Sequence, residues 1–326
     1  MDVLSDVLRN VRLTGAVYFD VNAREPWVAE TPATSRICAQ VMPAFEHAIS
    51  FHIMLDGICW AQLADESEPP VKLSSGDAVI FIGGEGHFMG SVPGKRAEPN
   101  MDLYVRPSDR PLPFLLNGLG GEGKAARFVC GYLGCDARPF NPILEALPRM
   151  LRVPANQNEA TTALIRMALA ENEKPRAGGE TILSKLSELM FLQAIRAHID
   201  TLPAESIGWL SGLRDRHVGR ALTLMHGRPG QDWTLDALAK EVGLSRSAFA
   251  ERFTELMGVP PMSYLGNWRL QVAARLLEAP SMSIAQAAAQ VGYESEAAFN
   301  RAFKKQVGLP PGAWRRSRAN GGRLPA

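Results

Sequence analysis

Residues 282–316 read MSIAQAAAQVGYESEAAFNRAFKKQVGLPPGAWRR, and this segment is the most informative about the structure of the C-terminal third of the chain. Residues 233–269 read WTLDALAKEVGLSRSAFAERFTELMGVPPMSYLGNWR and repeat the same pattern. From Ala248, which matches Ala298, the two copies keep a constant offset of 50 residues. A pattern that recurs at a fixed spacing indicates two copies of one supersecondary unit.

Each copy has the residue types that a helix-turn-helix requires. Thr234 and Ser283 are suited to cap the first helix of their copies, because a hydroxyl can accept from an unpaired backbone N–H. Gly243 suits the left-handed residue that ends this helix. Phe249 and Phe253 are four residues apart, which places both rings on one face of the second helix. The two predicted helix-turn-helix units span about residues 234–255 and 283–306.

The charge of the chain is unevenly distributed, although the 326 residues have a net charge of only +1. Residues 211–326 have 16 Lys and Arg against 9 Asp and Glu, a net charge of +7, whereas residues 1–210 have a net charge of −6. A basic half favours a polyanionic partner such as nucleic acid. The alternative is an ordinary helical bundle. The tandem repeat within a basic half favours DNA binding instead.

Residues from about 213 to 318 resemble the DNA-binding domain of the AraC/XylS family of transcription regulators. The resemblance rests on ALAKEVGLSRSAFAERF in the first copy and on AAQVGYESEAAFNRAFKKQVGLPPGAWRR in the second. It implies that a long helix at about 261–278 joins the two units and that the second helix of each unit contacts DNA. Together with two outward-facing lysines of the second copy, the implied contact residues are Arg246, Ser247, Ala250, Glu251, Glu296, Ala297, Asn300, Arg301, Lys304 and Lys305.

Glu251 departs from the family pattern, in which this position is often basic. A carboxylate cannot bind a phosphate, but it can accept a hydrogen bond from the N4 amino group of cytosine. The alternative is that Glu251 pairs with a neighbouring arginine. Arg301 in the second copy has the forked donor geometry that binds O6 and N7 of guanine.

The N-terminal part of the chain has a different pattern, in which short apolar segments alternate with turn residues. Many short strands with regular turns predict a small β-barrel or sandwich. Apolar residues at helical spacing then predict helices further along. The predicted strands include residues 17–21, 37–41, 50–55 and 79–82, and the predicted helices cover residues 142–151, 158–170 and 180–202.

Residues 74–87 read SSGDAVIFIGGEGH and resemble the second motif of cupin barrels, which ends here at His87. Ala44, Glu46 and Ser50 stand where the first motif of a metal-binding cupin has its ligands. A first-row metal needs about three protein ligands, so we expect neither a metal nor another cofactor. This half is similar to the cupin-type sensor domains of one branch of AraC/XylS regulators.

Five residues of this half are candidates for sensing an effector or a redox signal: His52, Trp60, His87, Cys130 and Cys135. The first three are predicted to line a pocket between the strands. The alternative for His87 is a solvent-capping histidine at the barrel rim, and inert packing is the alternative for the other four. A thiol switch at Cys130 requires an accessible thiol with a low pKa. Cys135 can form a disulfide with Cys130 only if the GYLG segment between them is a turn.

The sequence therefore predicts an α+β protein, with an N-terminal cupin-like β-barrel and trailing helices, then an all-α domain of two helix-turn-helix subdomains. The expected function is that of a sequence-specific transcription regulator rather than an enzyme. The alternative is a cupin-type enzyme with a helical docking module. The predicted domains are a sensor domain at residues 1–204, a linker at 205–212 and a DNA-binding domain at 213–326.

The expected partners follow from this assignment. They are a double-stranded DNA operator, a second copy of the chain that pairs through the helix at residues 180–202, and a small-molecule effector. RNA polymerase is a further candidate. The N-terminus has no secretory signal pattern and no stretch approaches the roughly 18 apolar residues of a membrane span. We therefore expect a cytoplasmic protein that does not interact with membranes.

Overall fold

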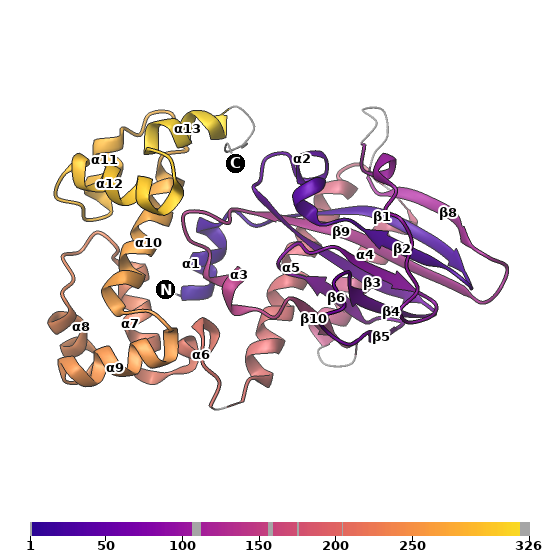
Figure 1. Cartoon of the computed structure of the whole chain (residues 1–326), viewed down its shortest axis with the longest axis horizontal. Coiled ribbons are helices and arrows are strands. Elements are labelled where there is room, and N and C mark those ends of the chain that lie inside the picture. The colour runs from indigo at the N-terminus through magenta and orange to yellow at the C-terminus, as the bar shows by residue number, and fades with distance from the viewer. Residues whose placement is uncertain (1, 106–111, 156–158, 175, 204, 320–326) are drawn as a thin grey trace. The chain divides into compact units, whose positions relative to one another are not determined.

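A computed structural model describes residues 2–105, 112–155, 159–174, 176–203 and 205–319 (Figure 1). The chain divides into two compact units, each assembled from separate stretches of sequence. The barrel unit consists of residues 13–135 and 147–200, and the helical unit consists of residues 1–12, 136–146 and 201–326. Residues 1, 106–111, 156–158, 175, 204 and 320–326 of the predicted domains lie outside the described residues.

The barrel unit contains two sheets that share one hydrophobic core. The strand order is β10-β6-β3-β9-β1-β8 in the larger sheet and β2-β7-β4-β5 in the smaller one. Tyr18 and Phe81 of the larger sheet pack in the same buried cluster as Ala61 and Met89 of the smaller sheet. The strands are β1 (Thr14–Arg24), β2 (Val28–Thr31), β3 (His47–Asp56), β4 (Ile58–Leu63), β5 (Val71–Ser74), β6 (Ala78–Phe81), β7 (His87–Gly90), β8 (Phe114–Gly120), β9 (Ala125–Cys135) and β10 (Met150–Val153).

Two helices, α4 (Glu159–Glu173) and α5 (Gly179–Thr201), cover the other face of the larger sheet (Figure 1). Ile165 of α4 and Leu183 and Met190 of α5 line one apolar gap together with side chains of β1, β3 and β9. The predicted order of strands followed by helices is therefore confirmed, as is the mixed fold class.

The prediction of a strand at residues 37–41 is wrong. This segment contains two short helical turns, η1 (Thr34–Arg36) and α2 (Cys38–Val41). Its buried side chains stand at positions 37, 38, 41 and 42, which is the spacing of one helix face and not the alternation of a strand.

The prediction of one helix over residues 142–151 is also wrong. Helix α3 (Pro142–Ala146) ends before Pro148, because proline disfavours helical geometry in the residue that precedes it. The apolar residues that follow form strand β10, which pairs with β6 at the edge of the larger sheet.

The helical unit contains the two predicted helix-turn-helix units. Thr234 accepts from the N–H of Ala237 at 3.1 Å, and Gly243 adopts a left-handed conformation with a φ of +74°. Phe249 and Phe253 are completely buried, and so are their counterparts in the second copy. The helices are α1 (Val3–Asn10), α3, α6 (Trp209–Arg214), α7 (Arg216–Gly227), α8 (Leu235–Val242), α9 (Arg246–Met257), α10 (Pro261–Leu276), α11 (Ile284–Gln290), α12 (Glu296–Val307) and α13 (Pro311–Ala319).

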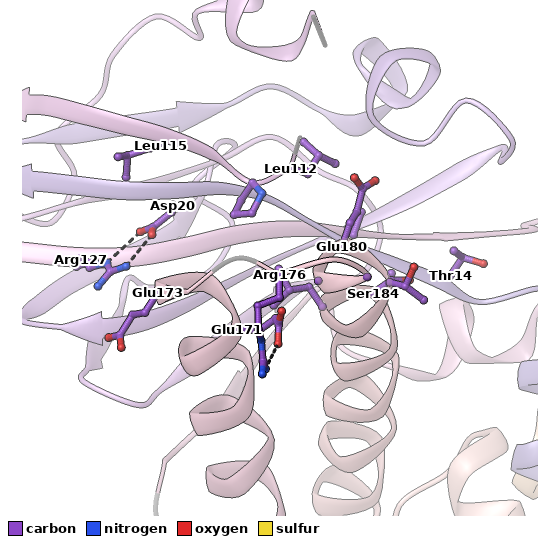
Figure 2. Close-up of a pocket in the computed structure, with 17 residues that line it drawn as sticks. Thr14, Asp20, Leu112, Leu115, Arg127, Glu171, Glu173, Arg176, Glu180 and Ser184 are labelled. Carbon is purple, nitrogen blue, oxygen red and sulfur yellow. Dashed lines mark hydrogen bonds and ion pairs between the residues drawn. The ribbon is translucent and has the colours of Figure 1, made fainter. Parts of the chain in front are cut away.

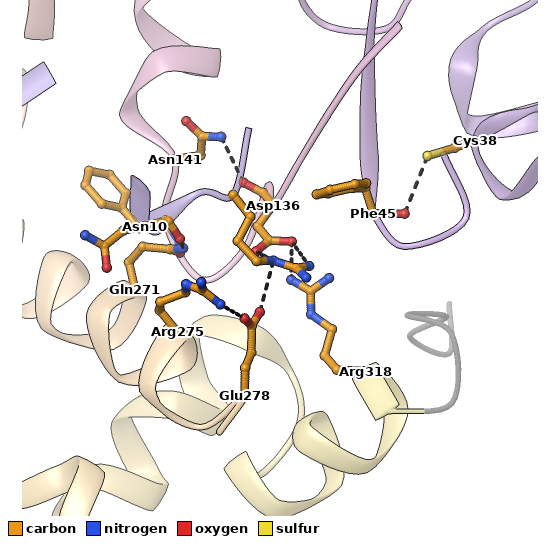
Figure 3. A network of polar contacts seen from close by, with 11 residues as sticks. Asn10, Cys38, Phe45, Asp136, Asn141, Gln271, Arg275, Glu278 and Arg318 are labelled. Atoms are coloured by element: carbon orange, nitrogen blue, oxygen red, sulfur yellow. Dashed lines mark hydrogen bonds and ion pairs between the residues drawn. The ribbon is translucent and has the colours of Figure 1, made fainter. Parts of the chain in front are cut away.

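Residues 1–12 and 136–146 pack within the helical unit, far in sequence from the helices that they contact. The amide of Gln271 on α10 is 1% exposed and connects both segments. Its Nε2 donates to the carbonyl of Asn10 at 2.8 Å, and its Oε1 accepts from the N–H of Phe140 at 3.0 Å (Figure 3). The predicted C-terminal domain is therefore completed by two earlier stretches of the chain.

An ionic cluster joins the same segments. The buried carboxylate of Asp136 receives two hydrogen bonds of 2.7 Å from Arg12 and pairs with Arg318 of α13 (Figure 3). Arg12 also lies 3.0 Å from Glu278, just beyond α10. A buried carboxylate is stable when such donors surround it. The cluster therefore ties both ends of the second helix-turn-helix to residues 12 and 136.

The predicted linker, residues 205–212, is partly helical. Helix α6 begins at Trp209, and Trp209 and Leu210 are buried in the helical unit. In the described part of the chain, no helix has both the length and the hydropathy that crossing a membrane requires.

Candidate nucleic-acid interface and signal site

Helix α9 presents the first set of predicted DNA contacts on its outer face. Ser245 caps the helix by accepting from the N–H of Ala248 at 3.2 Å. Because the phenylalanine rings hold one face inside the unit, the residues on the opposite face project outward. Arg246, Ser247 and Glu251 are exposed, and Ala250 is partly exposed.

Helix α12 repeats this arrangement in the second copy. Its N-cap, Ser295, accepts from the N–H of Ala298 at 3.2 Å. Asn300 is partly exposed, and its Nδ2 donates to the carbonyl of Glu296 at 2.9 Å. The remaining predicted contacts on this helix are all exposed: Glu296, Ala297, Arg301, Lys304 and Lys305.

The two outer faces differ in how their charges are paired. Arg301, Lys304 and Lys305 form no ion pair with any residue that the structure describes. Arg252 of α9, by contrast, pairs with Asp215 at 3.1 Å. Glu251 forms no ion pair with an arginine among the described residues. The structure therefore does not support the alternative that Glu251 pairs with a neighbouring arginine. Helix α12 therefore offers three unpaired cations, whereas α9 carries two exposed carboxylates, Glu251 and Glu255.

In the barrel unit, three of the predicted sensing residues lie in contact. Cys130 of β9 stands directly opposite His52 of β3 in the sheet register. The Nδ1 of His52 is 2.8 Å from the Sγ of Cys130, and its Nε2 is 2.6 Å from the Nε2 of His87 on β7. The Nδ1 of His87 is 3.0 Å from the carbonyl of Glu85. This chain of hydrogen bonds crosses the core from one sheet to the other.

The carbonyl of Glu85 at one end of this row of hydrogen bonds determines which group donates and which accepts in each of them. The carbonyl of Glu85 can only accept, so the Nδ1 of His87 carries a proton. In the neutral ring, its Nε2 then accepts from the Nε2–H of His52. The Nδ1 of His52 accepts in turn from the thiol of Cys130. One set of neutral tautomers therefore satisfies all four groups.

Burial favours the neutral form of each group in this chain. Desolvation lowers the pKa of His87 to about 4 and holds the pKa of His52 well below its ordinary value. Desolvation also raises the pKa of the Cys130 thiol far above its ordinary value. Cys130 is thus a buried hydrogen-bond donor and lacks the accessible thiolate that a thiol switch requires.

The sequence matches two family models. A cupin model matches residues 2–200, more than half of the chain, and a helix-turn-helix domain model matches residues 238–317. A putative AraC-like transcription regulator of Streptomyces lividans is 28% identical over 321 residues, which cover 97% of this chain and 98% of that protein. The transcriptional regulator AlkR of Acinetobacter baylyi is 26% identical over 334 residues, which cover 97% of this chain and 99% of the relative.

This chain belongs to the AraC/XylS family of transcription regulators, with an N-terminal cupin domain. Among solved structures, an AraC-type regulator from Chromobacterium violaceum is 28% identical. That alignment covers 32% of this chain and 95% of that one, with a TM-score of 0.31.

The structure does not bring the other two predicted sensing residues of this AraC/XylS regulator into the hydrogen-bonded chain. Trp60 of β4 is partly exposed and alternates with Cys59 and Ala61, which face the core. It therefore lies on the outer face of its sheet. Cys135 is buried at the end of β9.

The GYLG segment between Cys130 and Cys135 is part of strand β9 and not a turn. The two positions are five residue steps apart along the strand, which corresponds to about 17 Å at about 3.4 Å per residue. A disulfide requires Cα atoms within about 7 Å. Cys135 therefore cannot pair with Cys130 in this fold.

The cupin domain of this regulator also contains a cavity that the sequence gives no sign of. Its volume is about 990 Å³, and side chains of β1, β8, β9 and the α4–α5 connection line it. Figure 2 shows Asp20 beside Arg127 on the strands and Glu171 beside Arg176 at the turn between the helices. His52, Trp60 and His87 are not part of its lining.

Proposed function

We propose that this AraC/XylS regulator reads a specific operator with α9 and α12 and that a signal received by its cupin domain alters this binding. The observation that carries the proposal is the pair of equivalent, capped helices with exposed outer faces. A helix of this kind fits the major groove of B-DNA.

The side chains suggest a division of roles on these faces. Arg301 lies at the centre of the outer face of α12 and is suited to bind O6 and N7 of guanine. Lys304 and Lys305 lie nearer the end of the helix and are suited to bind phosphates. Glu251 on α9 is suited to accept from cytosine N4.

The test is a selection of bound duplexes from a random-sequence DNA library with the full chain. We expect enrichment of one motif, and an affinity for it that falls by orders of magnitude between about 50 and 200 mM salt. Binding without sequence enrichment, or binding independent of salt, would contradict the proposal. Arg36→Ala, at an exposed arginine of the cupin domain, is the control and should leave the motif unchanged.

We propose that the signal is a small molecule and not direct oxidation of Cys130. The thiol donates to His52, is buried, and has a raised pKa, so there is no thiolate to attack a mild oxidant. Mild peroxide should therefore leave operator affinity unchanged. A peroxide effect that Cys130→Ser abolishes would restore the redox alternative.

We further propose that the regulator binds its operator as a homodimer that pairs through α5. Ile182 and Leu189 are seven residues apart on this helix and are 41% and 47% exposed, so one apolar stripe faces away from the sheet. Leu189→Lys should convert the dimer into a monomer in sedimentation experiments, whereas Lys185→Gln on the same helix should not.

RNA polymerase remains a proposed partner at the operator, and transcription in vitro from a selected site is its test.

A further inference from the structure

The large cavity of the cupin domain has the size of a small-molecule site. Its volume of about 990 Å³ lies at the upper end of the range for drug-sized ligands. It lies on the side of the larger sheet that α4 and α5 cover, where β1, β8 and β9 meet the connection between the two helices. All of its lining residues belong to one compact unit.

Carboxylates outnumber cations in the lining. Asp20, Glu171, Glu173 and Glu180 face two arginines. Both arginines are already engaged: Arg127 makes a bidentate contact with Asp20, at 3.1 and 2.7 Å, and Arg176 pairs with Glu171 at 3.0 Å. The lining therefore has a net negative charge and favours a cation.

Glu171 is the group that most directly requires a ligand. Its side chain is 5% exposed, and its Oε1 accepts no hydrogen bond from any described residue. Leaving a buried carboxylate oxygen without a donor costs free energy. The partner of its other oxygen, Arg176, is 75% exposed, so water screens this ion pair and a ligand can compete with it.

Part of the cavity lining is apolar. Leu112, Pro113 and Leu115 line it from β8 and the residues just before this strand, and Leu183 lines it from α5. Leu115 is 59% exposed, which leaves a hydrocarbon surface open to a ligand. A wall of this kind favours the apolar body of a molecule whose charged end lies at Glu171.

We propose that this cavity is the effector site and that its ligand is an organic cation, with an ammonium or amidinium group at Glu171 and an apolar body against Leu112 and Leu115. The assignment rests on the proposed function, because it makes this ligand the signal that alters DNA binding. A protonated amine supplies the donors that Oε1 of Glu171 lacks.

The test uses dansylcadaverine, a fluorescent probe with a primary ammonium group on an apolar body, and the full chain. We expect saturable binding with a blue-shifted emission. The N-acetylated probe has the same body without the charge and should bind at least tenfold more weakly. No binding, or equal binding of the two probes, would overturn the assignment.

Variants locate the site. Glu171→Gln should weaken binding of the charged probe at least tenfold, whereas Glu122→Gln, at an exposed carboxylate outside the lining, should not. Leu115→Lys and Leu115→Glu are a second pair at an exposed position that tolerates both. The lysine should weaken binding and the glutamate should preserve or strengthen it. Equal affinities of these two variants would overturn the assignment even if Glu171→Gln fails to fold.

The effector role is measured separately, as the affinity for the selected operator with and without saturating probe. We expect a change of at least fivefold in wild type and no change in Glu171→Gln. Probe binding without an effect on DNA would overturn the effector role. Failure to bind any DNA sequence, with intact probe binding, would instead overturn the proposed function and leave the ligand site standing.

Discussion

At the residue scale, Arg301 and Lys305 test whether α12 reads bases or only phosphates. Both side chains are exposed, and neither is ion-paired within the described residues. Arg301→Ala should cost about 1–3 kcal/mol on the selected operator and relax its sequence preference. Lys305→Ala should weaken all duplexes by a similar factor and reduce the salt dependence. Equal losses for Arg301→Ala on the operator and on random DNA, measured by fluorescence anisotropy, would refute base reading.

The buried histidines make a second residue-scale prediction, which concerns pH. Desolvation lowers the pKa of both His52 and His87, and the pKa of His87 lies at about 4. Between pH 6.5 and 4, the unfolded chain takes up protons at these positions and the folded chain does not. The stability that is present above pH 6.5 should therefore be lost as the pH falls through this window, by about 3 kcal/mol for His87 alone.

Urea unfolding at a series of pH values, followed by circular dichroism, measures this loss. His87→Phe keeps an aromatic ring beside Phe81 and should flatten the pH dependence. Cys59→Ala removes a buried side chain of the same core without removing a histidine. It should lower stability by the same amount at every pH in the window. If the unfolding free energy of His87→Phe depends on pH as strongly as that of wild type, the assignment of His52 and His87 as neutral groups is wrong.

At the scale of the element, the N-cap of α12 stabilises the first turn of the helix that we propose binds the major groove. Ser295 accepts from the N–H of Ala298, and Ser295→Ala leaves this donor without a protein partner. The variant should lose about 1 kcal/mol of unfolding free energy. Ser263→Ala, at an exposed serine in the first turn of α10, should change the unfolding free energy by only a few tenths of a kcal/mol. Thermal unfolding of the two variants, with operator affinity as a second readout, makes the comparison.

At the scale of the whole molecule, Gln271 connects three distant parts of the sequence into one helical unit. Gln271→Leu would leave the carbonyl of Asn10 and the N–H of Phe140 without this partner at a part-buried site, at a cost of about 1 kcal/mol for each group. Gln306→Leu is the matched control. Gln306 is exposed and donates to the carbonyl of Pro139 at 3.2 Å, so water can replace it.

Urea midpoints followed by tryptophan fluorescence should separate the two glutamine variants. If Gln271→Leu is no less stable than Gln306→Leu, residues 1–12 and 136–146 do not stabilise the helical unit. The DNA-binding experiments use the full chain because a fragment that starts at residue 211 lacks both of these segments.

Local sequence was sufficient to predict the helix-turn-helix units almost completely. Thr234, Gly243 and the two phenylalanines of α9 act through contacts within one or two turns of chain, so their types and spacing are sufficient to predict the helices. It also placed His52 and His87 in one predicted pocket together with Trp60, but it singled out Cys130 only as a separate candidate.

The contacts between these candidates, by contrast, could be seen only in the folded structure. His52 and Cys130 are 78 residues apart, and their contact depends on the register between β3 and β9. The same is true of the cavity around Glu171 and of the packing of Gln271 against Asn10. Caps and periodic faces are set by neighbours a few residues away, whereas register, cavities and long-range packing depend on the folding of the whole chain. No local pattern encodes them.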